Sequence, residues 1–170
     1  MSAISCTPNV GRPRAFDMDT ALEKALEVFW RKGYDGTSLT DLTEAMGINK
    51  PSLYAAFGNK EQLFLKAIER YENRPSAFFY PSMQEPTAYR VAERILLGAA
   101  AEHSNPLHPP GCLMVQGALA CSDSGQSVKD ALIARRKAGF EQLVQRFEQA
   151  KISGDLPADA DPQGLAGFII

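Results

Sequence analysis

The sequence predicts an all-α protein, in which a short three-helix unit with a helix-turn-helix precedes a larger helical domain. Apolar residues recur every three or four positions along most of the chain. Capping residues and glycines separate these periodic segments. No segment shows a convincing alternation of apolar and polar residues of the kind that is typical of a strand.

Composition narrows the class of protein. The chain has 170 residues, of which 45% are hydrophobic, so a substantial core can form. No run approaches the roughly 18 apolar residues of a membrane span, and no signal peptide is recognisable. Three cysteines without paired spacing fit a reducing compartment, so we expect a cytoplasmic protein without a membrane partner. The net charge of -2 requires any nucleic-acid-binding surface to be local.

The first segments are an arm and a helix. Residues 1–16 contain prolines and no apolar periodicity, so we expect a flexible arm. A helix is expected over about 19–32, because apolar residues there follow helical spacing. Asp17 or Asp19 can cap its start, and Gly33 ends it.

A second helix follows a turn. Thr37 or Ser38 can cap it, with Asp41 at the position of a capping-box partner. Gly47 ends this helix, and we expect a positive φ there.

A third helix follows almost at once. Asn49 can cap it, and Pro51 falls in its first turn, where a missing N–H costs little. Leu53 and Phe57 are expected to be buried, and Gly58 ends the helix. A helix-turn-helix places such a second helix in the major groove of DNA.

The rest of the chain is also expected to be helical. Asn59 can cap a fourth helix with Gln62 as its capping-box partner. Prolines and a cluster of aromatic residues interrupt the pattern over 73–86. Further helices are expected over about 87–103, 111–122 and 126–153, and from residue 161 to the end. We therefore divide the chain into an arm (1–16), a helix-turn-helix DNA-binding domain (17–60) and a helical domain (61–170), for which ligand binding and dimerisation are implied by the family resemblance given below.

Polar residues near the start of the third helix are candidate DNA contacts. Lys50 can reach a phosphate or the O6 and N7 atoms of guanine, and Ser52 can bond a base or a phosphate. Tyr54 is expected to contact phosphate through its hydroxyl, because phosphate contacts outnumber base contacts. Thr37 and Ser38 either donate to phosphate or serve only as caps.

Three basic residues flank the helix-turn-helix. Lys60 lies at a helix N-terminus, where the exposed N–H groups already favour an anion such as phosphate. Arg12 and Arg14 are candidates for insertion into the minor groove, and the alternative is a disordered tail.

His103, His108 and Cys112 invite a metal or redox interpretation. A free cysteine is more commonly a small buried hydrophobe, so we expect no metal site and no cofactor. On one helix, Cys112 and Cys121 would lie about 13 Å apart, too far for a disulfide.

The family resemblance given below implies an effector pocket in the second domain. Four aromatic or Met residues are candidates for its lining, and each is equally well explained as core. They are Phe78, Tyr89, Met114 and Phe140. The usual pocket is apolar with a few polar groups, so the expected ligand is a small organic molecule.

Several motifs together resemble a known family. They are a Gly-Tyr-x-x-Thr-Ser turn at 33–38, Leu-Tyr-x-x-Phe at 53–57 and Asn-Lys-Glu-x-Leu-Phe at 59–64. Over about 11–71 the chain resembles the DNA-binding domain of TetR/AcrR-type bacterial transcriptional regulators. The remainder, including 111–114, is similar to the ligand-binding domain of an AcrR-like branch.

The resemblance implies a homodimeric repressor that a small-molecule effector releases from a palindromic DNA operator. An activator, and a metal- or redox-responsive sensor on the same frame, stay open as alternatives. An enzyme is not expected, because no nucleotide-binding loop, nucleophile motif or purposeful acidic pair is present. Family members usually continue into two long dimer-forming helices. We therefore expect this chain to be incomplete at its C-terminus, to dimerise poorly and to expose Phe168, Ile169 and Ile170.

Overall fold

All regular structure in the described part of the chain is helical. The computed structural model describes residues 16–74, 77–119 and 125–170. The all-α prediction is confirmed. Arg12, Arg14 and Cys121 lie outside the described residues. Among the described helices, none combines the length and apolar character that crossing a membrane requires.

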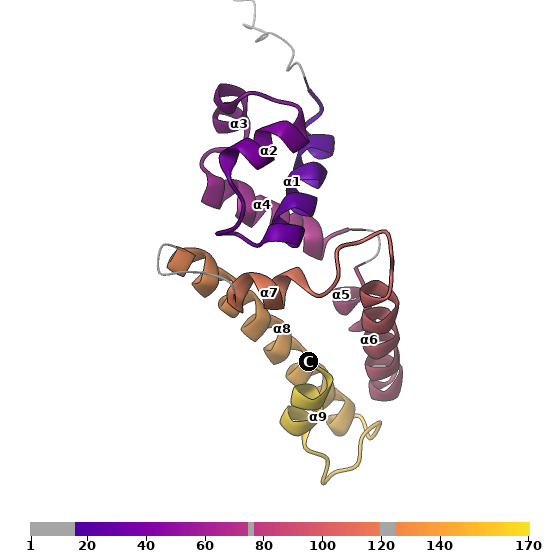
Figure 1. The fold of residues 1–170 in the computed structure, drawn as a ribbon. Helices are drawn as coiled ribbons and strands as arrows, with labels where there is room; N and C mark the ends of the chain where they lie inside the picture. The colour runs from indigo at the N-terminus through magenta and orange to yellow at the C-terminus, as the bar shows by residue number, and fades with distance from the viewer. Residues whose placement is uncertain (1–15, 75–76, 120–124) are drawn as a thin grey trace, which may run out of the picture.

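The helices form two groups (Figure 1). The first group is α1 (Met18–Lys32), α2 (Leu39–Met46), α3 (Lys50–Phe57) and α4 (Lys60–Glu72). The second is α5 (Phe79–Ser82), α6 (Ala88–His103), α7 (Leu113–Leu119), α8 (Gln126–Ile152) and α9 (Pro162–Ile169). Helix α7 and the start of α8 lie against the first group, and α9 packs beside the far half of α8.

Side-chain caps set the starts of α1 and α2. The Asp17 carboxylate accepts from the Thr20 N–H at 2.6 Å. Ser38, not Thr37, caps α2, and it forms the predicted capping box with Asp41. Gly47 ends α2 in the left-handed region at φ 68°, as the sequence predicted.

Asparagines set the starts of α3 and α4. Asn49 accepts from the Ser52 N–H at 2.8 Å, and Asn59 accepts from the Gln62 N–H at 2.8 Å. Gln62 in turn accepts from the Asn59 N–H, which completes the second predicted capping box. These local bonds fix where the two short helices begin.

The first hydrophobic core holds α1–α4 together and continues into α7 and α8. Phe29 of α1 meets Phe64 of α4 edge to face, with ring centroids 4.9 Å apart. Leu113 of α7 and Leu132 of α8 belong to the same cluster. Since Phe64 is central to this core, the core does not divide at residue 60, where we placed the domain boundary.

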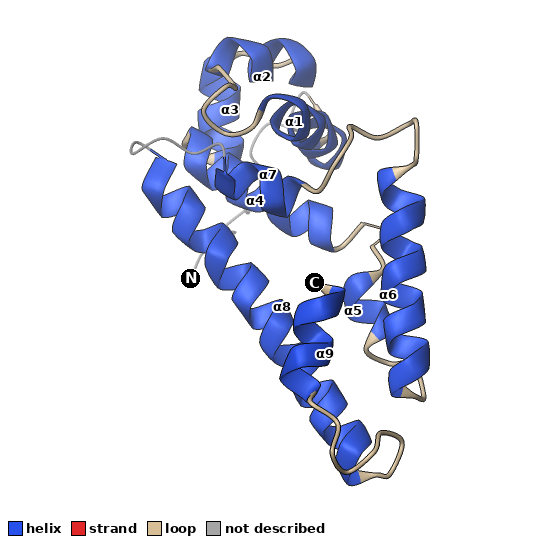
Figure 2. Ribbon diagram, turned by 60° about the horizontal axis from the view of Figure 1, so that its bottom comes forward, coloured by secondary structure: helices blue, strands red, loops and turns tan. Residues whose placement is uncertain are grey.

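A second core lies at the other end of α8 (Figure 2). It joins α6, α8 and α9 through Val91, Phe147 and Ala166, which are almost fully buried. Because α8 contributes to both cores, this single helix connects the two ends of the molecule.

Two expectations need correction. The segment 73–86 contains a short helix, α5, in which Pro81 occupies the first turn and removes no intrahelical hydrogen bond. At the chain end, Phe168 and Ile170 are exposed as expected, but Ile169 packs against the second core.

We predict that Phe29→Ala lowers the free energy of unfolding by about 3–5 kcal/mol, because it empties a buried site at the centre of the first core. Tyr89→Ala is the matched control, since this side chain is 71% exposed and its loss should change stability by less than about 0.5 kcal/mol. Urea unfolding followed by circular dichroism measures both. Equal effects of the two variants would contradict the assignment of the core.

Candidate functional site

Helix α3 presents a polar face outward. Leu53 and Phe57 anchor it, with exposed fractions of 0% and 2%. Lys50 is exposed, Tyr54 is 48% exposed and Ser52 is half-buried. Buried anchors at i and i+4 thus leave the side chains predicted to contact DNA accessible on the same short helix.

The two hydroxyl residues before α2 differ. Ser38 is exposed, and its hydroxyl bonds to Asp41 at 2.7 Å. Thr37 is 1% exposed, and its hydroxyl donates to the Gly33 carbonyl at 2.6 Å. The structure therefore argues against the predicted phosphate contact of the Thr37 side chain, because its donor is already used in the α1–α2 turn.

Lys60 is held at the start of α4. Its ammonium lies over the Tyr34 ring, 4.4 Å from the centroid. Burial lowers the pKa of Lys60, while the Asp35 and Asp41 carboxylates act in the opposite direction. A hydrogen bond from Lys32 and bonds from Ser38 hold the pKa of Asp41 well below its usual range. Lys60 is thus positioned by the turn, and its contact with phosphate stays a prediction.

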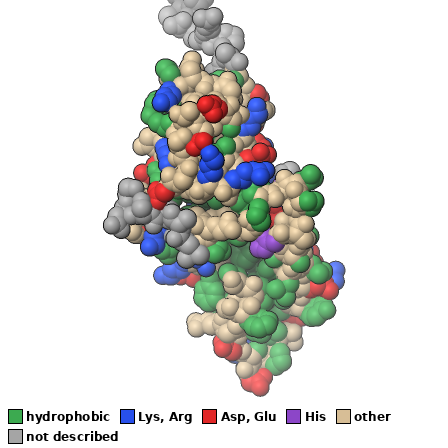
Figure 3. Space-filling model, viewed as in Figure 1, with side chains coloured by type: hydrophobic (Ala, Val, Ile, Leu, Met, Phe, Trp, Pro, Cys, Tyr) green, Lys and Arg blue, Asp and Glu red, His purple; other side chains and the backbone are tan. Residues whose placement is uncertain are grey.

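Charges of both signs cover the α1–α4 unit, whereas hydrophobic side chains gather over the second group of helices (Figure 3). Glu23, one of the acidic residues of α1, pairs with Arg70 of α4 at 2.9 Å. Acidic and basic side chains are mixed on this face (Figure 3), so the local basic surface stays a prediction.

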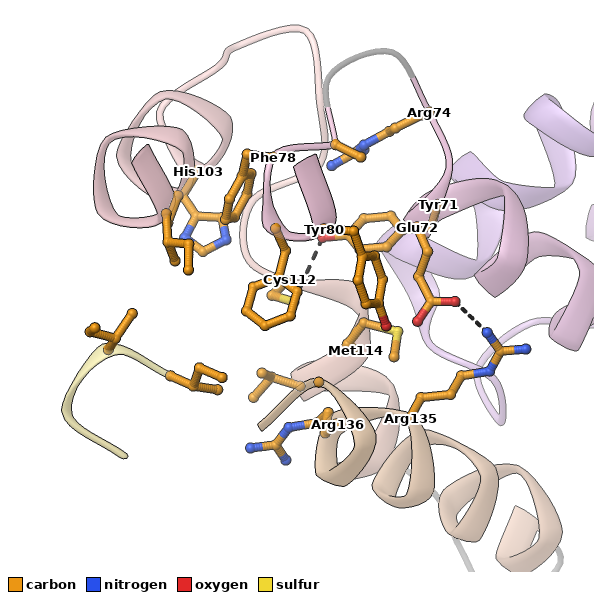
Figure 4. A pocket seen from close by; sticks show the side chains of 18 residues that line it. Tyr71, Glu72, Arg74, Phe78, Tyr80, His103, Cys112, Met114, Arg135 and Arg136 are labelled. Atoms are coloured by element: carbon orange, nitrogen blue, oxygen red, sulfur yellow. Dashed lines mark hydrogen bonds and ion pairs between the residues drawn. The ribbon is translucent and has the colours of Figure 1, made fainter. Parts of the chain in front are cut away.

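A cavity of about 290 Å³ lies where α4 ends and α5–α8 converge (Figure 4). Its walls are mainly apolar and aromatic, with several charged side chains among them. Phe78 and Met114 line it, as predicted. Tyr89 and Phe140 do not: Tyr89 is 71% exposed on α6, and Phe140 packs against the second core. The predicted pocket lining is wrong for these two residues.

A buried ion-pair cluster borders this cavity. Arg74 lies just after the end of α4, and its guanidinium pairs with the Glu102 carboxylate of α6 at 2.5 Å. The side chains are 9% and 5% exposed. His108 places Nδ1 2.6 Å from the same Glu102 oxygen. The Arg74 Nε atom is buried, and no described residue accepts a hydrogen bond from it.

Trp30 connects this cluster to α1. The Arg74 guanidinium lies 4.5 Å from the Trp30 ring centroid and 4.2 Å from that of Tyr71. The Trp30 indole N–H donates to the Gly111 carbonyl at 2.9 Å. One wall of the cavity is therefore in direct contact with the first helix of the DNA-binding unit.

The three candidate metal ligands make different contacts. His108 is engaged with Glu102, and Cys112 accepts a hydrogen bond from the Tyr71 hydroxyl at 3.6 Å. His103 lines the cavity from the end of α6. Within residues 16–74, 77–119 and 125–170, no three His, Cys, Asp or Glu side chains are grouped to hold a metal ion. The redox alternative rests on Cys112 and stays a hypothesis.

Sequence reasoning missed the ion-pair cluster. Arg74 and Glu102 lie on different elements, and no local spacing connects them. Tyr71 was recognisable as part of the apolar face of α4, and the aromatic cluster before α6 marked the cavity wall. The ion pair between Arg74, just after α4, and Glu102 of α6 is what shows that these residues belong to one site.

Comparison with known proteins gives consistent results. A family model described as bacterial regulatory proteins, tetR family, matches residues 21–67. The HTH-type transcriptional repressor ComR of Escherichia coli is 34% identical over 161 residues, which cover 94% of this chain and 77% of ComR. The HTH-type transcriptional repressor BdcR of Escherichia coli is 34% identical over 157 residues, which cover 85% of this chain and 79% of BdcR.

Solved structures are similar over most of the chain. A cysteine-substituted form of the TetR family transcriptional regulator CifR, complexed with double-stranded operator DNA, is 42% identical with a TM-score of 0.86. The similarity covers 93% of this chain and 83% of that one. A second CifR complex with operator DNA is 41% identical with a TM-score of 0.87, covering 94% of this chain and 83% of that one.

We predict that Glu102→Gln lowers the free energy of unfolding by about 3–5 kcal/mol, because it leaves the buried Arg74 charge without a counter-charge. In the double variant Arg74→Met, Glu102→Gln both charges are gone, and much of the stability should return. Urea unfolding of the single and double variants forms a double-mutant cycle. Additive losses would show that the pair is not coupled.

Tyr71 gives a pH prediction. Burial raises the pKa of its phenol, and the neighbouring Cys112 adds to the effect. The folded state then keeps the proton after an unfolded tyrosine, with a pKa of about 10, has lost it. This contribution to stability is full below pH about 10 and is lost as the pH rises further. Above that pH, the free energy of unfolding of Tyr71→Phe, measured with urea, should therefore fall less steeply with pH than that of the unvaried protein. Equal decreases in the two proteins would contradict a buried phenol.

Proposed function

This chain belongs to the TetR family of bacterial transcriptional regulators, and from that membership we propose that it represses transcription by binding an operator and releases it when a small effector binds. The observation that carries the DNA contact is the accessible face of α3, with Lys50 and Tyr54 outside and Leu53 and Phe57 buried. Its place of action is then the cytoplasm, and we propose no catalytic activity.

Similarity to the CifR structures supports a DNA-bound state, since those structures hold double-stranded operator DNA. The names of ComR and BdcR support repression over activation. A helix-turn-helix dimer binds two half-sites about one helical turn, or roughly 34–36 Å, apart. We therefore propose that the functional species is a homodimer on a palindromic operator.

The effector acts through the end of α4. Tyr71 and Arg74 line the cavity and also contact Trp30 of α1. A ligand that displaces these side chains changes how the cavity wall is held against α1, and with it the position of the whole α1–α4 unit, α3 included, relative to that of the other subunit. The ligand must bind the DNA-incompetent state more tightly, because only differential affinity shifts the equilibrium.

Selection of binding sites from random duplex DNA at fixed salt tests the proposal. An enriched palindrome with half-sites about one helical turn apart is the expected result. A folded protein that enriches no sequence would overturn operator binding.

We predict that Lys50→Ala lowers affinity for the selected operator by about tenfold and, if the contact is to phosphate, reduces the salt slope of log K by about 1. Lys137→Ala is the matched control, because this exposed lysine lies on α8, away from α3. Fluorescence anisotropy at several salt concentrations measures both. Unchanged affinity for Lys50→Ala would remove this residue from the interface.

A further inference from the structure

The charges around the cavity do not cancel. Arg74 is paired with Glu102, and Arg135 is paired with Glu72, which also lines the cavity. Arg136, the next residue on α8, lines the cavity as well; it is exposed to solvent and forms no ion pair with a described acidic side chain. Within these residues, the cavity therefore carries one arginine charge that the protein does not neutralise.

The remaining wall is apolar. Phe78 lines the cavity from the segment before α5, Phe79 from α5 and Ile95 from α6. Met114 lines it from α7. Such a surface favours an apolar ligand body, because burial of that body removes apolar surface from water. His103 lines the same cavity from the last residue of α6 and offers ring nitrogens to a polar group.

These features together define a ligand class, and we propose that the effector is a small organic monocarboxylate. Its carboxylate pairs with the Arg136 guanidinium, whose donor fork matches two carboxylate oxygens. Its aromatic or alkyl body packs against Phe78 and Ile95. This assignment rests on the proposed function, since it names the effector of the same site.

Size and charge narrow the class further. A cavity of about 290 Å³ is at the lower end of the range for ligand pockets, so the body is small. One unpaired arginine balances one negative charge. A phosphate ester carries nearly two charges, whereas Arg136 is the one arginine of the cavity lining that no described carboxylate pairs with.

Isothermal titration calorimetry on the full chain, without DNA, tests the site directly. The probes are benzoate and phenylacetate, each compared with its neutral amide. The carboxylates should bind at least tenfold more tightly than the amides, a difference of about 1.4 kcal/mol. In Arg136→Gln the ratio of carboxylate affinity to amide affinity should fall close to one. The matched control is Lys137→Gln, which removes an exposed positive charge from the adjacent position of α8 outside the cavity lining and should keep the ratio.

Equal binding of acid and amide, a ratio that persists in Arg136→Gln, or no binding of either carboxylate at millimolar concentration would each overturn the assignment. Circular dichroism of both variants confirms that they are folded before binding is compared. Operator affinity with and without benzoate is then measured separately. Binding of benzoate that depends on Arg136 and leaves operator affinity unchanged would support the carboxylate site and refute the effector role in the proposed function.

Discussion

The contact between the DNA-binding unit and the rest of the chain depends on how Arg74 is buried. A guanidinium removed from water needs a counter-charge and hydrogen-bond acceptors, or its burial is strongly unfavourable. Glu102 supplies the charge, and the Trp30 and Tyr71 rings cover the guanidinium. The requirement to satisfy this one cation brings together α1, the end of α4 and the end of α6, which are far apart in the sequence.

Helix α8 gives the second connection, and it is of a different kind. Leu132 belongs to the core of the DNA-binding unit, and Phe147 belongs to the core shared with α6 and α9. A continuous helix transmits displacement because its backbone hydrogen bonds keep its length fixed. The cavity lies between this stiff apolar connection and the polar contact at Arg74. Its lining includes residues of both, Arg74 on one side and Arg135 and Arg136 of α8 on the other.

The sequence predicted those interactions that join residues close together in the chain, and it missed those that join distant ones. The caps at Asp17, Ser38, Asn49 and Asn59 involve residues three positions apart, so the starts of α1–α4 were predictable. The residues that line the pocket were less predictable. Tyr89 lies on α6, but which face of α6 turns toward the cavity is decided by packing on α8, and that face carries Ile95 instead. The sequence does not reveal the Arg74–Glu102 pair, because the two residues are far apart in the chain and only the folded structure buries them together.

The polar contact is also the less completely satisfied of the two connections. Arg74 Nε has no acceptor among residues 16–74, 77–119 and 125–170, and a single Glu102 oxygen serves both Arg74 and His108. Since an unmade buried hydrogen bond costs about 1–3 kcal/mol, an alternative arrangement that supplies an acceptor to Nε competes with the present one on favourable terms. The first core has no such deficit, because close-packed apolar side chains such as Phe29 and Phe64 lose contacts in any other arrangement. Rearrangement between the DNA-binding unit and the cavity should therefore begin at Arg74, while α1–α4 move as one body.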